Sequence, residues 1–130
     1  MTNTTQRKIR IVVGEVSVEA VLLTTSTADA IWKALPLESI CNIWGDEIYF
    51  TIPLSHNLEP NARECLEKGE LGYWPQGPAF CIFFGPTPIS EGDEIRAASA
   101  VNVFGKVIGE CTPFKQARPN AMVRVEKAAL

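Results

Sequence analysis

The 130-residue sequence is poor in the side chains that bind metals or act as nucleophiles. Its single histidine, His56, lies in a polar stretch with no second histidine to share a metal ion. The cysteines lack the close spacing of a zinc-binding or redox pair, and they are Cys41, Cys65, Cys81 and Cys111. We therefore predict that the chain binds no metal and no cofactor, and that its thiols are structural side chains without a disulfide framework.

Long apolar runs and concentrated positive charge are also missing. No uncharged apolar run approaches the roughly 20 residues of a membrane-spanning helix, and the polar stretch 1–6 has no apolar middle like that of a secretory signal. The net charge is −3, and the one basic cluster, at residues 7–10, alternates as on the solvent face of a strand. We expect a cytoplasmic protein with neither a nucleic acid nor a membrane as its partner. The sequence leaves the oligomeric state open.

The rest of the composition is that of an average globular domain, with 46% hydrophobic and 21% charged residues. This length suffices for one hydrophobic core, and no repeat or low-complexity segment divides the chain. We therefore predict a single domain over residues 1–130.

Alternation of apolar and polar residues predicts strands along most of the chain. Residues 8–13 and 16–22 alternate on either side of a Gly-Glu turn, which is typical of a hairpin. The next stretch, 26–35, has one apolar face, a candidate cap at Ser26 and a proline at its end, so it predicts a short helix.

Further strands are expected on both sides of Gly45 within residues 38–53, at 70–84 and from 101 onward. The apolar run 79–84 after a Pro/Gly turn predicts a strand covered on both faces, and Gly105 predicts a bulge or bend. Residues 55–68 predict a loop with one helical turn near 62–66, and 122–125 predicts a last strand. About eight short strands and one clear helix favour a closed barrel or a sandwich.

Three segments, in the same order, resemble cyclophilins. Thr27–Leu35 is similar to the first helix of that family, Gly69–Phe84 to its paired central strands ending in a double phenylalanine, and Val101–Val107 to its late Phe-Gly-Lys-Val strand. The resemblance implies a mainly β fold, a closed eight-stranded β-barrel with one or two short capping helices.

A narrower resemblance is to small uncharacterised prokaryotic proteins described as cyclophilin-like. It rests on the segments Trp44–Phe50, Gly72–Pro75, Phe83–Pro88 and Ser99–Val103. This resemblance implies no established activity.

The catalytic side chains of prolyl isomerases have no match here. The resemblance places their arginine on the strand after the first helix, but no arginine occurs between Arg10 and Arg63. The glutamine before the double phenylalanine corresponds most nearly to Ile82. Loss of two polar groups worth ~1–3 kcal/mol each would cut the rate by orders of magnitude, so we do not expect efficient isomerase activity. Arg63 or Arg96 reaching over the aromatic residues would reverse this expectation.

The candidate site is therefore an outward-facing aromatic groove with a carboxylate. Strand alternation turns Glu47 and Tyr49 to the face opposite Phe50, and it separates Tyr73 from Trp74. The residues considered for this groove are Glu47, Tyr49, Tyr73, Trp74, Phe83, Phe84 and Phe104. The function expected is a non-catalytic module that binds a peptide or a small molecule. The alternatives are a weak or divergent prolyl isomerase, and an accessory domain of an amide-hydrolysing or carboxylating enzyme system.

Overall fold

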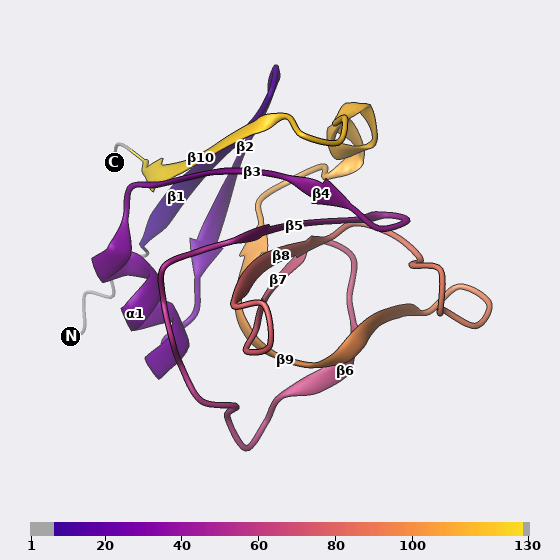
Figure 1. Cartoon of the computed structure of the whole chain (residues 1–130), viewed down its shortest axis with the longest axis horizontal. Helices are drawn as coiled ribbons and strands as arrows, with labels where there is room; N and C mark the ends of the chain where they lie inside the picture. Colours follow the sequence, from indigo (N-terminus) through magenta and orange to yellow (C-terminus); the bar gives the residue numbers. More distant parts are fainter. Residues whose placement is uncertain (1–6, 129–130) are drawn as a thin grey trace.

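The segments with alternating apolar and polar residues form one antiparallel sheet (Figure 1). The computed structural model describes residues 7–128. Within this range the sheet has ten strands. They are β1 (Lys8–Val13), β2 (Val16–Leu22), β3 (Leu37–Ile40), β4 (Asn42–Ile43), β5 (Glu47–Thr51), β6 (Arg63–Leu66), β7 (Glu70–Trp74), β8 (Ala79–Phe83), β9 (Ile95–Val107) and β10 (Met122–Lys127). A helix, α1 (Ser26–Ala34), and a 3-10 helix at Thr112–Gln116 complete the described part.

The sheet is open, so the prediction of a closed eight-stranded barrel is wrong. The hydrogen-bonded order is β3-β10-β1-β2-β9-β7-β8-β5-β4, with β6 pairing to β9. The chain crosses from one end of this order to the other at Cys41, between β3 and β4. There the Cys41 N–H donates to the Ala121 carbonyl (3.0 Å), and the Cys41 carbonyl accepts from the Asn120 N–H (3.0 Å). These bonds continue the pairing of β3 with β10, while β4 pairs with β5, so the two end strands follow each other along the chain and do not pair with each other.

Helix α1 covers one side of the sheet through its apolar face. Ala28 and Ile31 are fully buried, while Trp32 packs at the edge with the charged ends of Arg7 and Lys127 over its ring. The N-cap is Thr25 rather than the expected Ser26, because the Thr25 hydroxyl accepts the Ala28 N–H (3.0 Å). Among residues 7–128, no helix has both the length and the apolar character that a membrane crossing requires.

Strand β8 is buried on both faces, as its continuous apolar run predicted. Phe80 and Ile82 face the main core, whose residues come from α1 and from most strands of the sheet, including the β1–β2 hairpin. Phe80 stacks on Phe50, with 4.8 Å between ring centroids. Cys81 and Phe83 point the other way, into a second core. That second core consists of Leu66, Ala79, Cys81, Phe83, Ile95, Ala97 and Val101, with Tyr49, Trp74 and Val103 packed against it.

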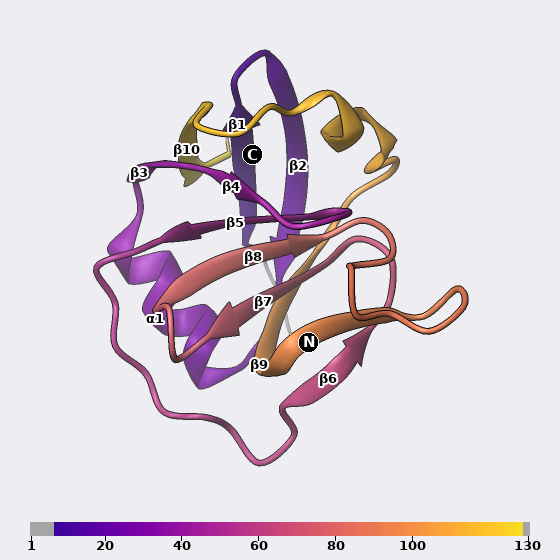
Figure 2. The same cartoon turned by 45° about the vertical axis from the view of Figure 1, so that its right-hand side comes forward.

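The second core exists because β9 bends around it. Figure 2 shows the start of β9 beside β6 and its end beside β2, and β7 pairs with residues 102–106 in the second half of β9. The register against β7 shifts between Leu71 and Gly72, so β9 has an extra residue next to Gly105, where a bulge was expected. The helical turn expected near 62–66 is wrong, because this segment forms β6 and pairs with the bent β9.

The long connection between β5 and β6 is held in place by two buried side chains. Asn102 accepts the Glu59 N–H (2.7 Å) and donates to the Asn57 carbonyl (2.9 Å) and to the Thr27 hydroxyl (3.0 Å). The Tyr73 hydroxyl donates to the Leu54 carbonyl (2.8 Å). These bonds satisfy the backbone of a segment that has no strand partner.

Replacing Asn102 by alanine is expected to destabilise the protein by about 3 kcal/mol, because backbone groups of the connection lose their partners inside the fold. Urea unfolding of the two proteins measures this difference. Asn61→Ala, at an exposed position of the same connection, is the control and should leave the midpoint unchanged. Equal midpoints for Asn102→Ala and Asn61→Ala would show that Asn102 does not hold the segment.

Candidate functional site

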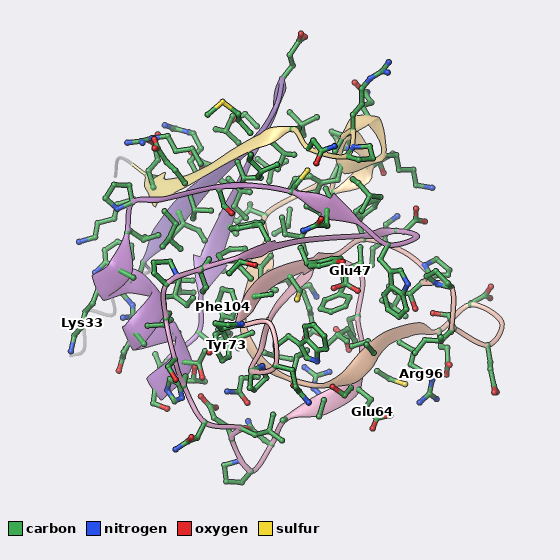
Figure 3. The ribbon with its side chains drawn as sticks, in the orientation of Figure 1. Lys33, Glu47, Glu64, Tyr73, Arg96 and Phe104 are labelled. Atoms are coloured by element: carbon green, nitrogen blue, oxygen red, sulfur yellow. The ribbon has the colours of Figure 1, made fainter. Side chains whose placement is uncertain are left out.

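A cavity of about 170 Å³ opens beside the second core. We call it the Glu47 cavity, and its lining consists of Trp44, Glu47, Tyr49, Trp74, Cys81, Ala97, Ala98 and Val101. The side chain of Glu47 projects from β5 into the ring outlined by β5, β8, β7 and β9 (Figure 3). The lining is mostly aromatic and aliphatic, with one carboxyl group.

Strand register brings the lining residues together. Tyr49 and Gly72 both pair with Cys81, from β5 and β7, and Trp74 pairs with Ala79. Glu47 stands two residues before Tyr49 and therefore faces the same side of the sheet. A side chain at position 72 would fill part of this face, since a Cβ there would lie 2.6 Å from Val101 Cγ2. Glycine thus lets β9 pack closely against β7 behind the cavity.

The aromatic walls are held by turns and hydrogen bonds. Trp44 precedes the β4–β5 turn, which is closed by backbone bonds between Trp44 and Glu47 (2.9 and 3.1 Å) and passes through Gly45 at φ 61°. The Trp74 indole N–H donates to the Ser99 hydroxyl (2.7 Å), which fixes the ring against the start of β9. The small side chains Ala97 and Ala98 leave the space between these walls open.

Glu47 is a buried carboxyl group without a counter-ion. Only 5% of the residue is exposed, and none of the ion pairs formed by residues 7–128 includes it. Burial raises the pKa of Glu47 from 4.5 to about 7, and the adjacent Cys81 thiol offsets part of this rise. The carboxyl group therefore changes its charge near neutral pH.

Cys81 cannot supply a thiolate to the cavity. Its complete burial, and then the charge and hydrogen bonding of Glu47, raise the pKa of the thiol well above its ordinary value. Nucleophilic cysteines need the opposite environment, with positive charge nearby. Across the described range, no three His, Cys, Asp or Glu side chains gather in a way that could hold a metal ion.

The residues expected to form the groove divide between the two faces of the sheet. Glu47, Tyr49 and Trp74 line the Glu47 cavity. Phe83 is fully buried in the second core, on the same face of the sheet. Tyr73, Phe84 and Phe104 lie in the main core and contribute nothing to the cavity, and Figure 3 shows Tyr73 next to Phe104 on the α1 side. Consecutive strand residues point to opposite faces of a sheet. Tyr73 therefore cannot share a face with Trp74, nor Phe84 with Phe83.

Sequence reasoning missed five lining residues. Cys81 had a usable signal, because it lies on the same face as Phe83 in a run that was expected to be covered on both faces. Trp44 lies between β4 and the β4–β5 turn, outside both strands, where alternation does not apply. Ala97, Ala98 and Val101 belong to the bent strand β9, and small side chains leave no pattern that predicts a cavity.

The arginines are engaged away from the Glu47 cavity. Arg63 pairs with Glu70 (2.8 Å), and Arg96 pairs with Glu94 (2.7 Å) and Glu64 (3.2 Å). Figure 3 shows Arg96 and Glu64 on the outer side of the ring, pointing away from Glu47. Arg7, Arg10 and Arg124 are also ion-paired, and Arg118 borders a separate hollow beside the β1–β2 turn. No guanidinium lines the cavity in the described structure.

Comparisons with known proteins match nearly the whole chain. A family model described as Cyclophilin-like covers residues 7–126. Among solved structures, the chain is similar to the solution structure of a hypothetical protein from Archaeoglobus fulgidus, with 40% sequence identity, a TM-score of 0.81 and 95% of each chain covered. No curated protein matches the chain.

Replacing Glu47 by glutamine is expected to change how stability depends on pH. The folded state holds the Glu47 proton up to about pH 7, whereas the unfolded chain releases it near 4.5. The free energy of unfolding therefore falls as pH rises between these two values. The fall amounts to about 3 kcal/mol in total and is complete above pH 7. Glu47→Gln removes this term, so the variant should exceed the native protein in stability at pH 8 and match it near pH 4.5.

Urea unfolding over this pH range measures the effect. Glu15→Gln, at an exposed position in the β1–β2 turn, is the matched control and should show no such pH-dependent gain. A constant difference between native protein and Glu47→Gln at every pH would contradict the burial of an ionisable carboxyl.

Proposed function

The chain belongs to the cyclophilin-like family, and from this membership and the Glu47 cavity we propose that it is a non-catalytic binding module. Its ligand is a small molecule, or a single side chain of a peptide, that enters the cavity. The observation that carries this proposal is an accessible, aromatic-walled space with a solitary buried carboxyl group. Such a combination of apolar walls and one polar anchor is typical of ligand sites.

The size of the cavity limits the ligand. Drug-sized molecules occupy pockets of about 300–1,000 Å³, whereas an apolar cavity of about 150 Å³ holds one benzene molecule. The Glu47 cavity, at about 170 Å³, therefore suits a single ring or a comparably bulky group. An extended peptide does not fit inside it, although one of its side chains does.

The chemistry of the lining argues against catalysis. Prolyl isomerisation needs a fixed donor near the twisting amide, and no guanidinium lines the cavity in the described structure. Glu47 titrates near neutral pH, as general acids and bases do, but among the described residues the lining holds no histidine, no lysine and no second carboxyl group to act with it. The Trp74 indole N–H is engaged with Ser99, and the Cys81 thiol stays protonated.

We expect no prolyl isomerase activity. An exchange-NMR assay on an Ala-Pro peptide should give the uncatalysed interconversion rate, because no cavity side chain stabilises the twisted amide. Cyclophilin itself, assayed on the same peptide, is the positive control. Turnover at ordinary cyclophilin rates would overturn the non-catalytic proposal.

Single-ring probes test the binding proposal. Phenol, indole and benzylamine, each titrated into the ¹⁵N-labelled protein, are expected to shift the backbone amide signals of Cys81, Ala97 and Val101. Ala98→Phe should abolish these shifts, because it places a ring at the exposed cavity mouth without disturbing a buried position.

Ser17→Phe is the matched control for this experiment, as it adds the same ring at an exposed position on β2. It should bind the probes as the native protein does. Absence of shifts with all three probes, or identical shifts in Ala98→Phe, would refute the cavity as a binding site.

A further inference from the structure

Three aromatic side chains and one carboxyl group share the Glu47 cavity, and each comes from a different position in the fold. Trp44 lies before the β4–β5 turn, Tyr49 on β5 and Trp74 on β7, while Glu47 lies at the start of β5. The faces of aromatic rings attract cations electrostatically, and sites built from several such rings recognise quaternary ammonium groups. A carboxylate within the same space adds a full negative charge.

We propose that the Glu47 cavity binds an organic ammonium cation, whose methyl or methylene groups contact Trp44 and Trp74 and whose charge faces Glu47. This inference rests on the proposed function, because it requires that the cavity be a binding site. It adds the chemical class of the ligand. A trimethylammonium group is about as bulky as benzene, which an apolar cavity of about 150 Å³ accommodates.

The unpaired state of Glu47 supports a positively charged ligand. An ionised carboxylate in an apolar surrounding loses its hydration and needs a partner. The described chain provides arginine partners to glutamates elsewhere, such as Arg63 to Glu70, but none to Glu47. A cation in the cavity supplies that missing charge.

The donor set selects an organic cation over a metal ion. Hard cations such as Ca²⁺ take six or more oxygen ligands. The side chains that line the cavity offer only the Glu47 carboxyl and the Tyr49 hydroxyl as oxygen ligands. A weakly hydrated ammonium group instead exchanges its water for aromatic contacts.

The affinity for such a cation should depend on pH. The titratable groups that face Glu47 are the Cys81 thiol from β8 and the Tyr49 hydroxyl from β5, while β7 and β9 present Trp74, alanines and Val101. The carboxyl group carries its charge only above about pH 7. Cation binding should therefore strengthen as pH rises through neutrality.

Choline and its neutral isostere 3,3-dimethylbutan-1-ol test the proposal directly, because they differ in charge and hardly in shape. Calorimetric or NMR titrations are run at pH 5.5 and 8.5 on the full chain. We expect choline to bind about tenfold more tightly than the alcohol at pH 8.5, and this preference to fall sharply at pH 5.5.

Glu47→Gln should lower the preference for choline at pH 8.5 to the value that the native protein shows at pH 5.5, and so remove its pH dependence. Glu64→Gln, which changes an exposed carboxyl on β6, is the matched control and should keep the preference. The pH series on the native protein gives the same information if the Glu47 variant fails to fold.

The outcomes separate this inference from the proposed function. Equal affinities for choline and the alcohol at pH 8.5 would overturn the cation assignment and leave the cavity a binding site. A preference for choline that is equally large at pH 5.5 and 8.5 would also overturn it, because the charge of Glu47 would then play no part in binding. No binding of either compound, together with no binding of the single-ring probes, would refute both.

Discussion

Burial of β8 on both faces is the constraint on which the rest of the structure depends. Because successive side chains of a strand point to opposite sides, this strand must supply two separate cores with apolar groups. The second core then needs its own cover, and the bent strand β9 with β6 provides it. The side chains of the neighbouring strands are divided between the same two cores. Glu47 and Tyr49 on β5 must face the second core because Ile48 and Phe50 face the main one.

This division also bears on the positions of the isomerase side chains. The glutamine that the isomerase resemblance placed near Ile82 would be in the main core, where Ile82 is fully buried among apolar side chains. Charged side chains that could bind a peptide form ion pairs with one another outside the ring, as Arg96 does with Glu94. The walls of the Glu47 cavity, on the second face, can attract a ligand through dispersion and through the electrostatics of aromatic rings. The cavity holds one carboxyl group, Glu47, whose ionised form is destabilised by burial. This chemistry is the basis of the proposed binding function.

Much of the fold could be predicted from the sequence, and the reasons for the failures are physical. Alternation placed Ile48 and Phe50 on the buried face, and the apolar run of β8 indicated two-sided burial. The motif resemblance to small cyclophilin-like proteins is confirmed by the family match over residues 7–126. The prediction of a closed sheet was wrong because alternation indicates which residues form strands, but not which strands pair at the two ends of the sheet. The start of β9 was missed because Arg96 to Ala100 is polar or small rather than alternating.

The candidate site was predictable only in part. Its carboxyl and two of its aromatic groups followed from alternation, whereas Phe104 was assigned to the groove although it packs on Phe80 in the main core, 5.0 Å away between ring centroids. Aromatic residues signal large apolar surface without indicating which of two cores they fill. The cavity exists because Ala97, Ala98 and Gly72 have small side chains or none. A hydrophobicity pattern does not show where small residues leave space.

The open sheet leaves short edge strands. An unpaired edge is a template on which another molecule can add a strand, and long flat edges promote aggregation. Here the hydrogen-bonded order ends at β3, with four residues, and at β4, with two. Because these strands are so short, an incoming strand would find only a few backbone groups in register. The shortness of the two strands that end the order thus discourages edge-to-edge stacking between molecules.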